Sequence, residues 1–502
     1  MSNLIFSSLS QDYTILIPEI FLATVFVLKI CYGVFYTKLM KKPLAQNVLW
    51  LSVWALLLTI FLVYNNPYEN YYILNRTFIC DDLAIYFKIA ILLCSICVLS
   101  ISADSFSKTK MNHFEVILLF LCACLSLMIQ VTANDFLSLY LSLEFQTLTF
   151  YVLAASKPKD FFSAEAGLKY FILGALSSGL LVFGFSFIYG FTGTMKFDDL
   201  TQIIQTNPEL VNDWTYPLMF IAAGLLFKFP AAPFHTWAPD VYEGSPTPCT
   251  AFFAIVPKLS IISVFIRLFW QTGLVQLDTN FLDQNGFFLL LLASSMLSLF
   301  VGAFYAIGQV NIKRLFAYSS IGHVGFILAG LIWSSSFDLS IPLLYTLLYA
   351  ILSLGLFSLI LSFRKRGISY RSLQDLRFLA QTSPLVAYAF AGILFSSAGI
   401  PPLAGFFPKA ATLNLLISQS NYFLSIWAIL LSCVTCFYSL KVIQFLFFQQ
   451  YSTWIGLDPL NRQNALILVI TLGITLCYIL FPQGLNSLTH FLALSLSTPL
   501  CF

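Results

Sequence analysis

Five charged residues interrupt long apolar runs of the chain. One is Glu144, in the stretch LYLSLEFQTLTFYVL, and the other four are Lys169, Lys228, Lys258 and Lys409. A charged side chain at the centre of a bilayer costs about 2.5–3.5 kcal/mol on insertion scales. Such residues are retained where they pair, line a wet cavity or move protons. The set therefore predicts a polar site inside a membrane protein.

The excess of lysines over carboxylates favours proton transfer over a purely structural role. A static ion pair between two helices would account for Glu144 and one lysine, but it leaves the other lysines without acidic partners. Desolvation and neighbouring like charges both disfavour the ammonium form. A lysine that is close to neutrality can accept and release a proton. We therefore interpret the series as a buried proton relay.

Two proline-rich strings place helix breaks beside two of these lysines. In LLFKFPAAPFHTWAPDVYEGSPTP, Pro230 and Pro233 follow Lys228, and in LFSSAGIPPLAGFFPKAAT the prolines 401–402 precede Lys409. Proline removes a backbone donor and breaks a helix. At membrane depth, the freed carbonyl groups are tolerated only beside packed protein or a water-filled cavity. The strings predict one broken helix in each half of the chain.

Two histidines are further candidates for the relay. His323 lies among small residues in YSSIGHVGF, and His235 follows Lys228 with prolines between them. Each is interpreted either as a relay member or as a polar packing residue. Asp240 and Glu243 fall in the string APDVYEGSPTP, which we interpret as a loop. We expect these two carboxylates to bind neighbouring backbone groups rather than to carry protons.

The elements that must hold these residues are membrane-spanning helices. Of 502 residues, 59% are hydrophobic and only 9% are charged, whereas soluble domains carry about 25% charged residues. A spanning helix needs ~20 mostly apolar residues. Fourteen segments qualify, and they lie near 14–36, 47–64, 84–103, 113–132, 135–155, 165–191, 215–239, 248–270, 286–307, 314–334, 341–363, 384–418, 422–449 and 463–482.

These spans predict an all-α polytopic membrane protein with about 14 transmembrane helices and breaks in helices 7 and 12. Helices 1–3 occupy residues 1–112, and helix 14 with the tail occupies 450–502. The two broken helices indicate duplicated halves, with helices 4–8 in 113–270 and helices 9–13 in 286–449. Because each half has an odd number of spans, the two repeats would be inverted in the membrane.

Basic residues in the loops predict the orientation. Loops opposite the termini hold fifteen lysines and arginines, whereas loops on the side of the termini hold only Arg76 and Lys196. By the positive-inside rule, the basic loops face the cytoplasm or the matrix, and both termini face the opposite compartment. Four further cations lie toward span ends, where snorkelling to the interface explains them; they are Lys29, Lys88, Arg267 and Lys441.

Other features exclude several classes of function. The C-x-x-C pairs Cys94/Cys97 and Cys433/Cys436 lie inside apolar stretches, so we interpret them as packing residues. The sequence has no dinucleotide-binding glycines, no P-loop and no iron–sulfur cysteine run, which predicts neither a redox cofactor nor a metal in this chain. A net charge of +3 is too weak to indicate a nucleic-acid partner.

Four strings in order resemble a known family. EAGLKYFILGALSSG, FHTWAPDVYEGSPTP, IKRLFAYSSIGHVGF and AGIPPLAGFFPK are similar to subunit 2 of mitochondrial NADH:ubiquinone oxidoreductase, respiratory complex I, the counterpart of bacterial subunit N. The resemblance runs from about residue 80 to about residue 450. It implies an antiporter-like subunit with fourteen helices, two inverted five-helix repeats and a proton-translocating axis at mid-membrane.

The resemblance also implies a role for each buried charge. By motif, the residues that match the family's helices five, six, seven, eight and twelve are Glu144, Lys169, Lys228, Lys258 and Lys409. In this scheme Glu144 pairs with Lys169 or Lys228, redox chemistry elsewhere perturbs the pair, and charge then shifts along the remaining lysines. Pro408, in FFPK, departs from the family's local spelling.

The wider setting follows from the same resemblance. It implies a subunit of a proton-translocating NADH:ubiquinone reductase in the mitochondrial inner membrane, with basic loops on the matrix side and both termini on the intermembrane-space side. No cofactor is expected in this chain, and other subunits would carry FMN, iron–sulfur clusters and ubiquinone. The expected partners are the other membrane-arm subunits of complex I and membrane lipids.

Three alternatives share much of this pattern. A cation/proton antiporter subunit would have the same helix plan and buried lysines. A counterpart in the chloroplast ferredoxin-linked complex would share the motifs as well. A purely structural spacer would need the charges for assembly but not for coupling.

Overall fold

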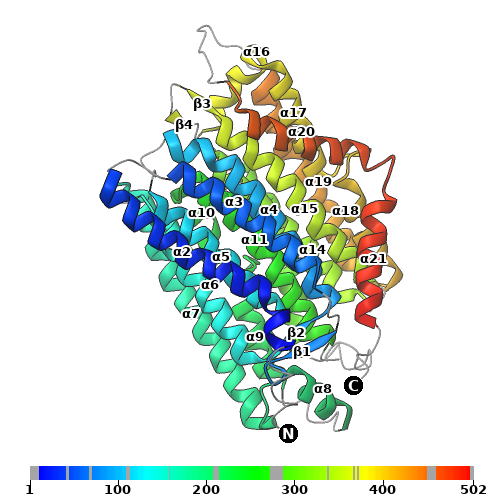
Figure 1. Ribbon diagram of the computed structural model, residues 1–502. Coiled ribbons are helices and arrows are strands. Elements are labelled where there is room, and N and C mark those ends of the chain that lie inside the picture. The colour runs from blue at the N-terminus through cyan, green and yellow to red at the C-terminus, as the bar shows by residue number, and fades with distance from the viewer. Residues whose placement is uncertain are drawn as a thin grey trace.

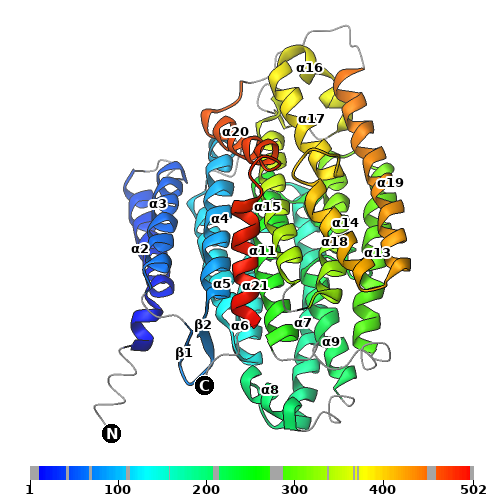
Figure 2. The same cartoon turned by 90° about the vertical axis from the view of Figure 1, so that its right-hand side faces the viewer.

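The long apolar runs of the sequence form α-helices, because a chain inside a bilayer must satisfy its backbone hydrogen bonds within each segment. The computed structural model shows these helices side by side in one bundle (Figures 1 and 2). It describes residues 11–40, 45–66, 70–108, 113–157, 159–206, 214–271, 286–335, 338–365, 368–369, 372–448 and 459–497.

Eleven helices in the described part of the chain are long and apolar enough to cross a membrane. They are α2 (Ile17–Met40), α3 (Ala45–Tyr64), α4 (Asp82–Lys108), α5 (Phe114–Thr132), α6 (Phe136–Ala154), α7 (Phe161–Thr192), α11 (Thr247–Ile266), α13 (Gly286–Ile307), α14 (Ile312–Trp333), α15 (Ser340–Ser362) and α19 (Tyr422–Phe447).

Three apolar helices are shorter, and two of them are the first halves of broken helices. The three are α9 (Thr215–Lys228), α17 (Pro384–Ala398) and α20 (Arg462–Cys477). Helix α9 is followed by α10 (Trp237–Gly244), and α17 is followed by α18 (Phe406–Ser418). The predicted breaks in helices 7 and 12 are therefore confirmed. The total of fourteen spans stays a prediction, since these three helices are too short alone for ~20 residues per span.

The remaining elements are short or lie at the ends of the bundle. They are α8 (Phe197–Thr206), α16 (Leu379–Thr382), α21 (Gln483–Ser497), the π-helix η2 (Arg267–Gln271), the 3₁₀-helix η3 (Leu373–Phe378) and the strands β1 (Tyr71–Ile73), β2 (Phe78–Cys80), β3 (Arg364–Lys365) and β4 (Ile368–Ser369). The strands pair as two antiparallel hairpins, β1–β2 and β3–β4.

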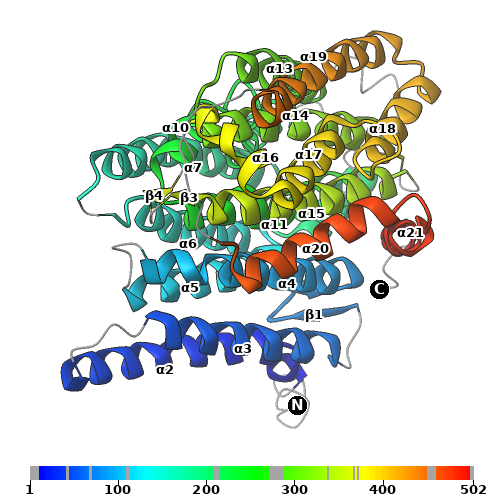
Figure 3. The same ribbon diagram turned by 90° about the horizontal axis from the view of Figure 1, so that it is seen from above.

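Helix α11 lies at the centre of the bundle, and the helices around it bury it completely. Its membrane-grade window is fully buried inside the chain, and it packs against α4, α5 and α15. Seen from above, α2 and α3 form an outer layer beside α4 and α5 (Figure 3). An apolar helix that is buried on every side belongs to a bundle core, so any charge on α11 is held in the most enclosed part of the protein.

The two ends of the bundle differ in their loops. The β1–β2 hairpin and α8 lie at one end, and the β3–β4 hairpin and α16 lie at the other (Figures 1 and 2). The first end carries Arg76 and Lys196, and the second carries loops of the basic set. Of that set, Lys41, Lys42, Lys110, Arg366 and Arg371 lie outside the described residues.

Helices α13 and α14 pack closely because glycines meet at their crossing. A Cβ atom on Gly302 would lie 2.4 Å from the backbone nitrogen of Gly322. No side chain fits at that distance. Small residues at helix crossings let membrane helices approach and gain van der Waals contact. The contact fixes α14, which carries His323, against its neighbour.

Snorkelling is the wrong interpretation for three of the four cations near span ends. Lys29 is only 6% exposed, and its Nζ has no hydrogen-bond partner among the described residues. The side chains of Lys88 and Arg267 are only 5% and 2% exposed, and they form buried ion pairs with Glu19 and Asp81. The sequence did not reveal these pairs, because each cation is flanked by apolar residues and its acidic partner lies far away in the sequence. The fourth cation, Lys441, is half-buried and donates from Nζ to the carbonyl oxygen of Ile307 at 2.9 Å.

Candidate proton-relay site

Lys258 lies on α11 with its side chain turned toward α15. Its Nζ donates to the hydroxyl oxygen of Tyr349 at 2.8 Å and lies 4.5 Å from the centre of that ring. The hydroxyl donates in turn to the carbonyl oxygen of Ala254 at 3.1 Å. A hydrogen bond to a charged group contributes about 1.5–3 kcal/mol, whereas burying an ammonium ion costs several kcal/mol. Lys258 thus has a physical reason to release a proton.

Pro257 opens the backbone of α11 next to Lys258. Because proline has no N–H group, the carbonyl of Phe253 lacks its usual donor within the helix. The hydroxyl of Tyr242 donates to that carbonyl at 3.3 Å. The break in the hydrogen-bond ladder is thus closed by a side chain, and the helix stays continuous through the lysine.

His323 lies on α14 beside Tyr349 and a second tyrosine of α15, Tyr345. Its Nδ1 is 3.0 Å from the hydroxyl oxygen of Tyr345, and its ring centre is 5.4 Å from that of Tyr349. The side chains of Lys258 and Lys409 both act electrostatically on this imidazole. His323 is therefore within electrostatic range of both lysines, as a proton carrier between them would need to be.

Lys409 lies in the first turn of α18 and reaches back to the end of α17. Its Nζ donates to the carbonyl oxygens of Ser397 and Ala398 at 2.9 and 2.7 Å. These carbonyls end a helix and have no intrahelical partner, and they carry the negative end of the helix dipole. Gly399, with φ of +87°, ends α17 in the left-handed conformation and leaves room for the lysine. The break at prolines 401–402 thus creates the binding site for this ammonium group.

Lys228 lies in the last turn of α9, where the helix stops before Pro230. The residue is 5% exposed, and its Nζ has no hydrogen-bond partner among the described residues. Glu144, half-buried on α6, is its electrostatic partner without forming a direct ion pair. A buried cation without a direct partner is costly to keep. Water or a proton shift is needed to satisfy it.

Lys169 lies apart from this group and corrects the expected pairing with Glu144. Its Nζ forms ion pairs with Glu165 at 2.8 Å and with Asp240 at 3.0 Å, and its side chain is 44% exposed. An exposed pair of this kind contributes about 0–1 kcal/mol. The apolar flanks of Lys169 suggested deep burial, but the residue lies only two turns into α7.

The carboxylates of the APDVYEGSPTP string also differ from expectation. Asp240 and Glu243 lie on the short helix α10 rather than in a loop. Both form ion pairs with Arg314 on α14, at 3.4 Å each, and Glu243 accepts a hydrogen bond from Asn311. The group links α7, α10 and α14, so these carboxylates join helices rather than cap them.

His235 lies between α9 and α10 and is half-buried. Its Nδ1 is buried and has no hydrogen-bond partner in the described part of the chain. The contacts give it no link to Lys258, His323 or Lys409, and its place in the relay stays a prediction.

Tyr345 and Tyr349 belong to the site but were not among the residues singled out from sequence. They are four residues apart on α15 and therefore share one helix face, with one hydroxyl at His323 and the other at Lys258. The string LLYTLLYAIL carries this spacing. Two tyrosines on one face of a membrane helix were a usable signal, because a buried hydroxyl needs a polar partner.

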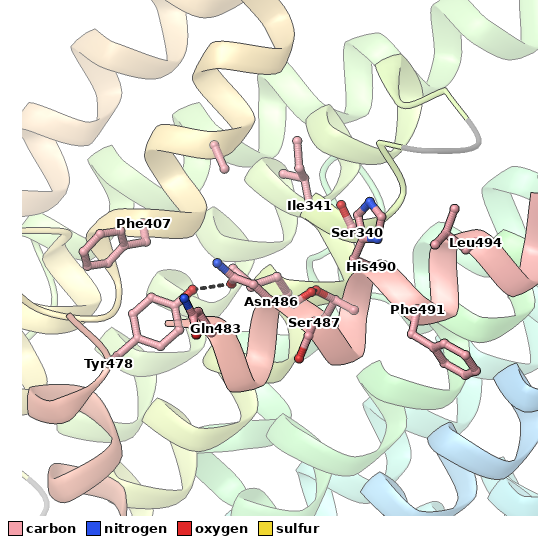
Figure 4. Close-up of a pocket in the computed structure, with 13 residues that line it drawn as sticks. Ser340, Ile341, Phe407, Tyr478, Gln483, Asn486, Ser487, His490, Phe491 and Leu494 are labelled. Carbon is pink, nitrogen blue, oxygen red and sulfur yellow. Dashed lines mark hydrogen bonds between the residues drawn. The ribbon is translucent and has the colours of Figure 1, made fainter. Parts of the chain in front are cut away.

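One cavity among the described residues lies away from the relay. It has a volume of about 820 Å³ and is lined by α15, α18 and α21, together with Tyr478 (Figure 4). The hydroxyl of Tyr478 donates to Oδ1 of Asn486 at 2.7 Å across one side of it. None of the relay lysines lines this cavity. Among the described residues, no group of three or more His, Cys, Asp and Glu side chains is placed to hold a metal ion.

The helical bundle with two broken helices and enclosed lysines defines an antiporter-like membrane subunit. The family described as NADH:quinone oxidoreductase/Mrp antiporter, transmembrane, matches residues 133–435. NADH-ubiquinone oxidoreductase chain 2 of Marchantia polymorpha is 38% identical over 97% of this chain and 99% of its own. NADH-quinone oxidoreductase subunit N of Pelagibacter ubique is 38% identical over 95% and 98%.

Solved structures agree with this assignment. A chain of respiratory complex I from Thermus thermophilus superposes with a TM-score of 0.77 at 25% identity, covering 94% of this chain and 98% of the other. A chain of the Mrp complex from Dietzia sp. DQ12-45-1b has the same TM-score at 19% identity, covering 96% and 97%, and shows the fold alone. The chain belongs to the NADH:quinone oxidoreductase/Mrp antiporter family, and within it to the group of chain 2 and subunit N.

Proposed function

We propose that this chain is a core membrane-arm subunit of respiratory complex I, which contributes a proton-translocation channel coupled to NADH oxidation and ubiquinone reduction. The observation that carries the proposal is the contact series from Lys258 through Tyr349 and His323 toward Lys409. We infer the redox reaction from the family and from the relatives of this chain. Other subunits would perform it with FMN, iron–sulfur clusters and ubiquinone.

In this proposal the buried lysines exchange protons in turn. Lys228, near Glu144, receives charge when that pair is perturbed. Lys258 passes a proton to the Tyr349 hydroxyl as this hydroxyl releases its own proton toward His323, directly or through water. His323 takes up that proton on one ring nitrogen and releases a proton from the other toward Lys409. The carbonyls at the end of α17 stabilise the ammonium form of Lys409 until this lysine releases its proton. Lys169 would act at the edge of this relay, through its pairs with Glu165 and Asp240.

The test is replacement of Lys228 by Ala in the whole complex. We expect the complex to assemble and NADH-driven proton pumping to fall strongly, because the cation that couples Glu144 to the relay is lost. The measurement is proton uptake into membrane vesicles, divided by the amount of assembled complex on a native gel. Normal pumping by this variant would contradict the relay.

A cation/proton antiporter subunit is the second candidate, because the Mrp chain has the same fold. Native-gel separation of mildly solubilised membranes distinguishes the two. We expect this chain to migrate with a large NADH-oxidising assembly that contains flavin and iron–sulfur subunits. If it migrates in a small assembly without NADH activity, the antiporter is favoured, and sodium- or potassium-linked exchange becomes the assay.

The remaining organisation follows from the same proposal. The chain would be a multi-pass protein of the mitochondrial inner membrane that contacts other membrane-arm subunits and lipids. Residues 113–270 and 286–449 would be inverted repeats, each with one broken helix that carries a lysine. Basic loops would face the matrix, and both termini would face the intermembrane space.

A further inference from the structure

Two buried ion pairs lie outside the relay. Nη2 of Arg267 is 2.9 Å from Oδ1 of Asp81, and the two side chains are 2% and 7% exposed. Nζ of Lys88 is 2.5 Å from Oε1 of Glu19, with 5% and 8% exposed. Asp81 directly follows β2, so its pair lies toward the β1–β2 end of the bundle. These four groups are titratable or charged, and the proposed relay uses none of them.

Stability alone does not explain a buried ion pair. The cost of removing two charges from water can exceed their attraction, so apolar residues of similar volume often stabilise a protein as well or better. The retention of both pairs therefore points to a requirement for a defined position. The two pairs differ in what they join, and that difference indicates which of them bears on the relay.

The Asp81–Arg267 pair joins two parts of the chain that the family comparison separates. Asp81 lies before the matched segment 133–435, and Arg267 lies within it. Glu19 and Lys88 both lie before that segment. The first pair thus attaches the N-terminal helices to the antiporter-like core, whereas the second joins α2 to α4 within the N-terminal helices.

Asp81 is held rigidly at the start of α4. Its Oδ1 also accepts a hydrogen bond from the backbone N–H of Ala84 at 2.9 Å, so the carboxylate caps the helix. The N-terminal end of a helix attracts negative charge. The same oxygen binds Arg267, and the guanidinium group is therefore tied to the first turn of a 27-residue helix.

Arg267 belongs to the same continuous element as Lys258. It begins the π-helix η2, which directly continues α11. Nine residues separate it from Lys258, which is about 14 Å along a helix. π-Helical turns are rare and often occur at functional sites. Any shift of Arg267 along the helix axis therefore moves Lys258 relative to Tyr349 on α15.

We propose that the Asp81–Arg267 ion pair is a positioning contact that fixes α11 against α4 and so holds Lys258 at hydrogen-bond distance from Tyr349. This inference rests on the proposed relay function. A displacement of about 1 Å between reacting groups can cost about 10²-fold in rate, and the 2.8 Å bond of Lys258 leaves little tolerance. The Glu19–Lys88 pair joins α2 to α4 and includes no residue of α11, so we expect it to serve assembly.

The experiment compares the two pairs in the whole complex. Asp81→Asn removes the charge that binds Arg267 but keeps a side chain that can cap α4. The matched control is the double variant Glu19→Gln/Lys88→Met, which removes the other buried pair. The measurement is NADH-driven proton pumping per assembled complex. We expect a fall of about tenfold or more in Asp81→Asn and no change in the control.

Each result decides the proposal. Wild-type pumping by Asp81→Asn overturns it, and so does an equal loss in the control, which would indicate general destabilisation. If Asp81→Asn does not assemble, Arg267→Lys keeps the charge and loses the guanidinium geometry; reduced pumping in the assembled variant supports the proposal. Wild-type pumping or failed assembly of Arg267→Lys overturns it, since the pair would then serve folding alone.

A third variant separates this inference from the function on which it rests. Lys258→Met removes the ammonium group itself. If Lys258→Met loses pumping while Asp81→Asn keeps it, only the positioning contact is rejected. If Lys258→Met keeps full pumping, Lys258 has no role in the relay. The proposal that the ion pair positions Lys258 for pumping is then rejected as well.

Discussion

The ammonium nitrogen of Lys409 lies 2.7 Å from the carbonyl oxygen of Ala398, so the lysine of one half-helix closes the end of the other. The break that separates α17 from α18 frees the carbonyls of residues 397 and 398, and the first turn of α18 supplies the cation that binds them. A broken helix is thus more than a gap in the bundle. It is the reason that a charged lysine is stable at this depth.

Gly399→Ala should disturb this arrangement without removing a charge. A Cβ atom at Gly399 would lie 2.8 Å from Cδ and 3.2 Å from Nζ of Lys409, and φ of +87° disfavours a side chain by about 1 kcal/mol. We expect a clear loss of pumping per assembled complex, because the ammonium group is pushed off the carbonyls. The measurement is proton uptake by vesicles.

Gly193→Ala is the matched control for that variant. Gly193 also has a positive φ, of +72°, but a Cβ atom there would meet nothing within 4 Å. Gly193→Ala therefore introduces backbone strain without a new side-chain contact. Equal losses of pumping in the two variants would show that strain, rather than contact with Lys409, causes the effect.

Tyr349→Phe tests the hydroxyl that accepts a hydrogen bond from Lys258, on a ring that lies beside His323. The substitution removes the acceptor of Lys258 and leaves a buried ammonium group without that bond, which costs about 1–3 kcal/mol. We expect slower pumping with assembly retained, since the ring stays in place. Tyr242→Phe is the comparison, because the hydroxyl of Tyr242 donates to the carbonyl of Phe253 and, among the described residues, bonds none of the proposed relay groups. Unchanged pumping in Tyr349→Phe would remove the hydroxyl from the relay.

Lys169→Gln should affect pumping less than Lys258→Met. The Lys169 side chain is 44% exposed, and its pairs with Glu165 and Asp240 are screened, so each contributes about 0–1 kcal/mol. Lys258 is fully enclosed on α11. Both variants are compared by pumping per assembled complex. An equal or larger loss in Lys169→Gln would mean that the edge of the relay limits the rate.

The sequence was sufficient for the long apolar helices and for the two breaks, but not for the short helix α10 or for the pairing of charges. Long apolar runs and prolines act locally, so α9, α17 and their breaks follow from the residues themselves. Lys169 pairs with Glu165 one turn away on its own helix, but its second partner is Asp240, 71 positions away. The partner of Arg267 is Asp81, 186 positions away. Such long-range contacts depend on which helices pack together. The residue pattern within one helix does not indicate which helices those are.

The tyrosines show a second limit of the same kind. Tyr345 and Tyr349 look like ordinary aromatic packing residues on an apolar helix, and only the position of α15 beside α11 and α14 brings their hydroxyls to Lys258 and His323. Charge at membrane depth identified the lysines, because it is costly anywhere in a bilayer. A hydroxyl group costs far less to bury. The spacing of the two tyrosines can indicate a polar neighbour, but which residues they bind emerges only from the packed structure.

The proposed orientation can be tested by labelling from each side of the membrane. Gln202, exposed on α8, lies at the end with the β1–β2 hairpin, and Val310, 56% exposed, lies in the loop between α13 and α14 at the opposite end. The positive-inside rule places the Val310 end in the matrix. A membrane-impermeant maleimide should therefore label Gln202→Cys from the intermembrane space and Val310→Cys only in inverted membranes. Labelling of the unsubstituted chain measures the background from native cysteines, and the reverse pattern would invert the proposed topology.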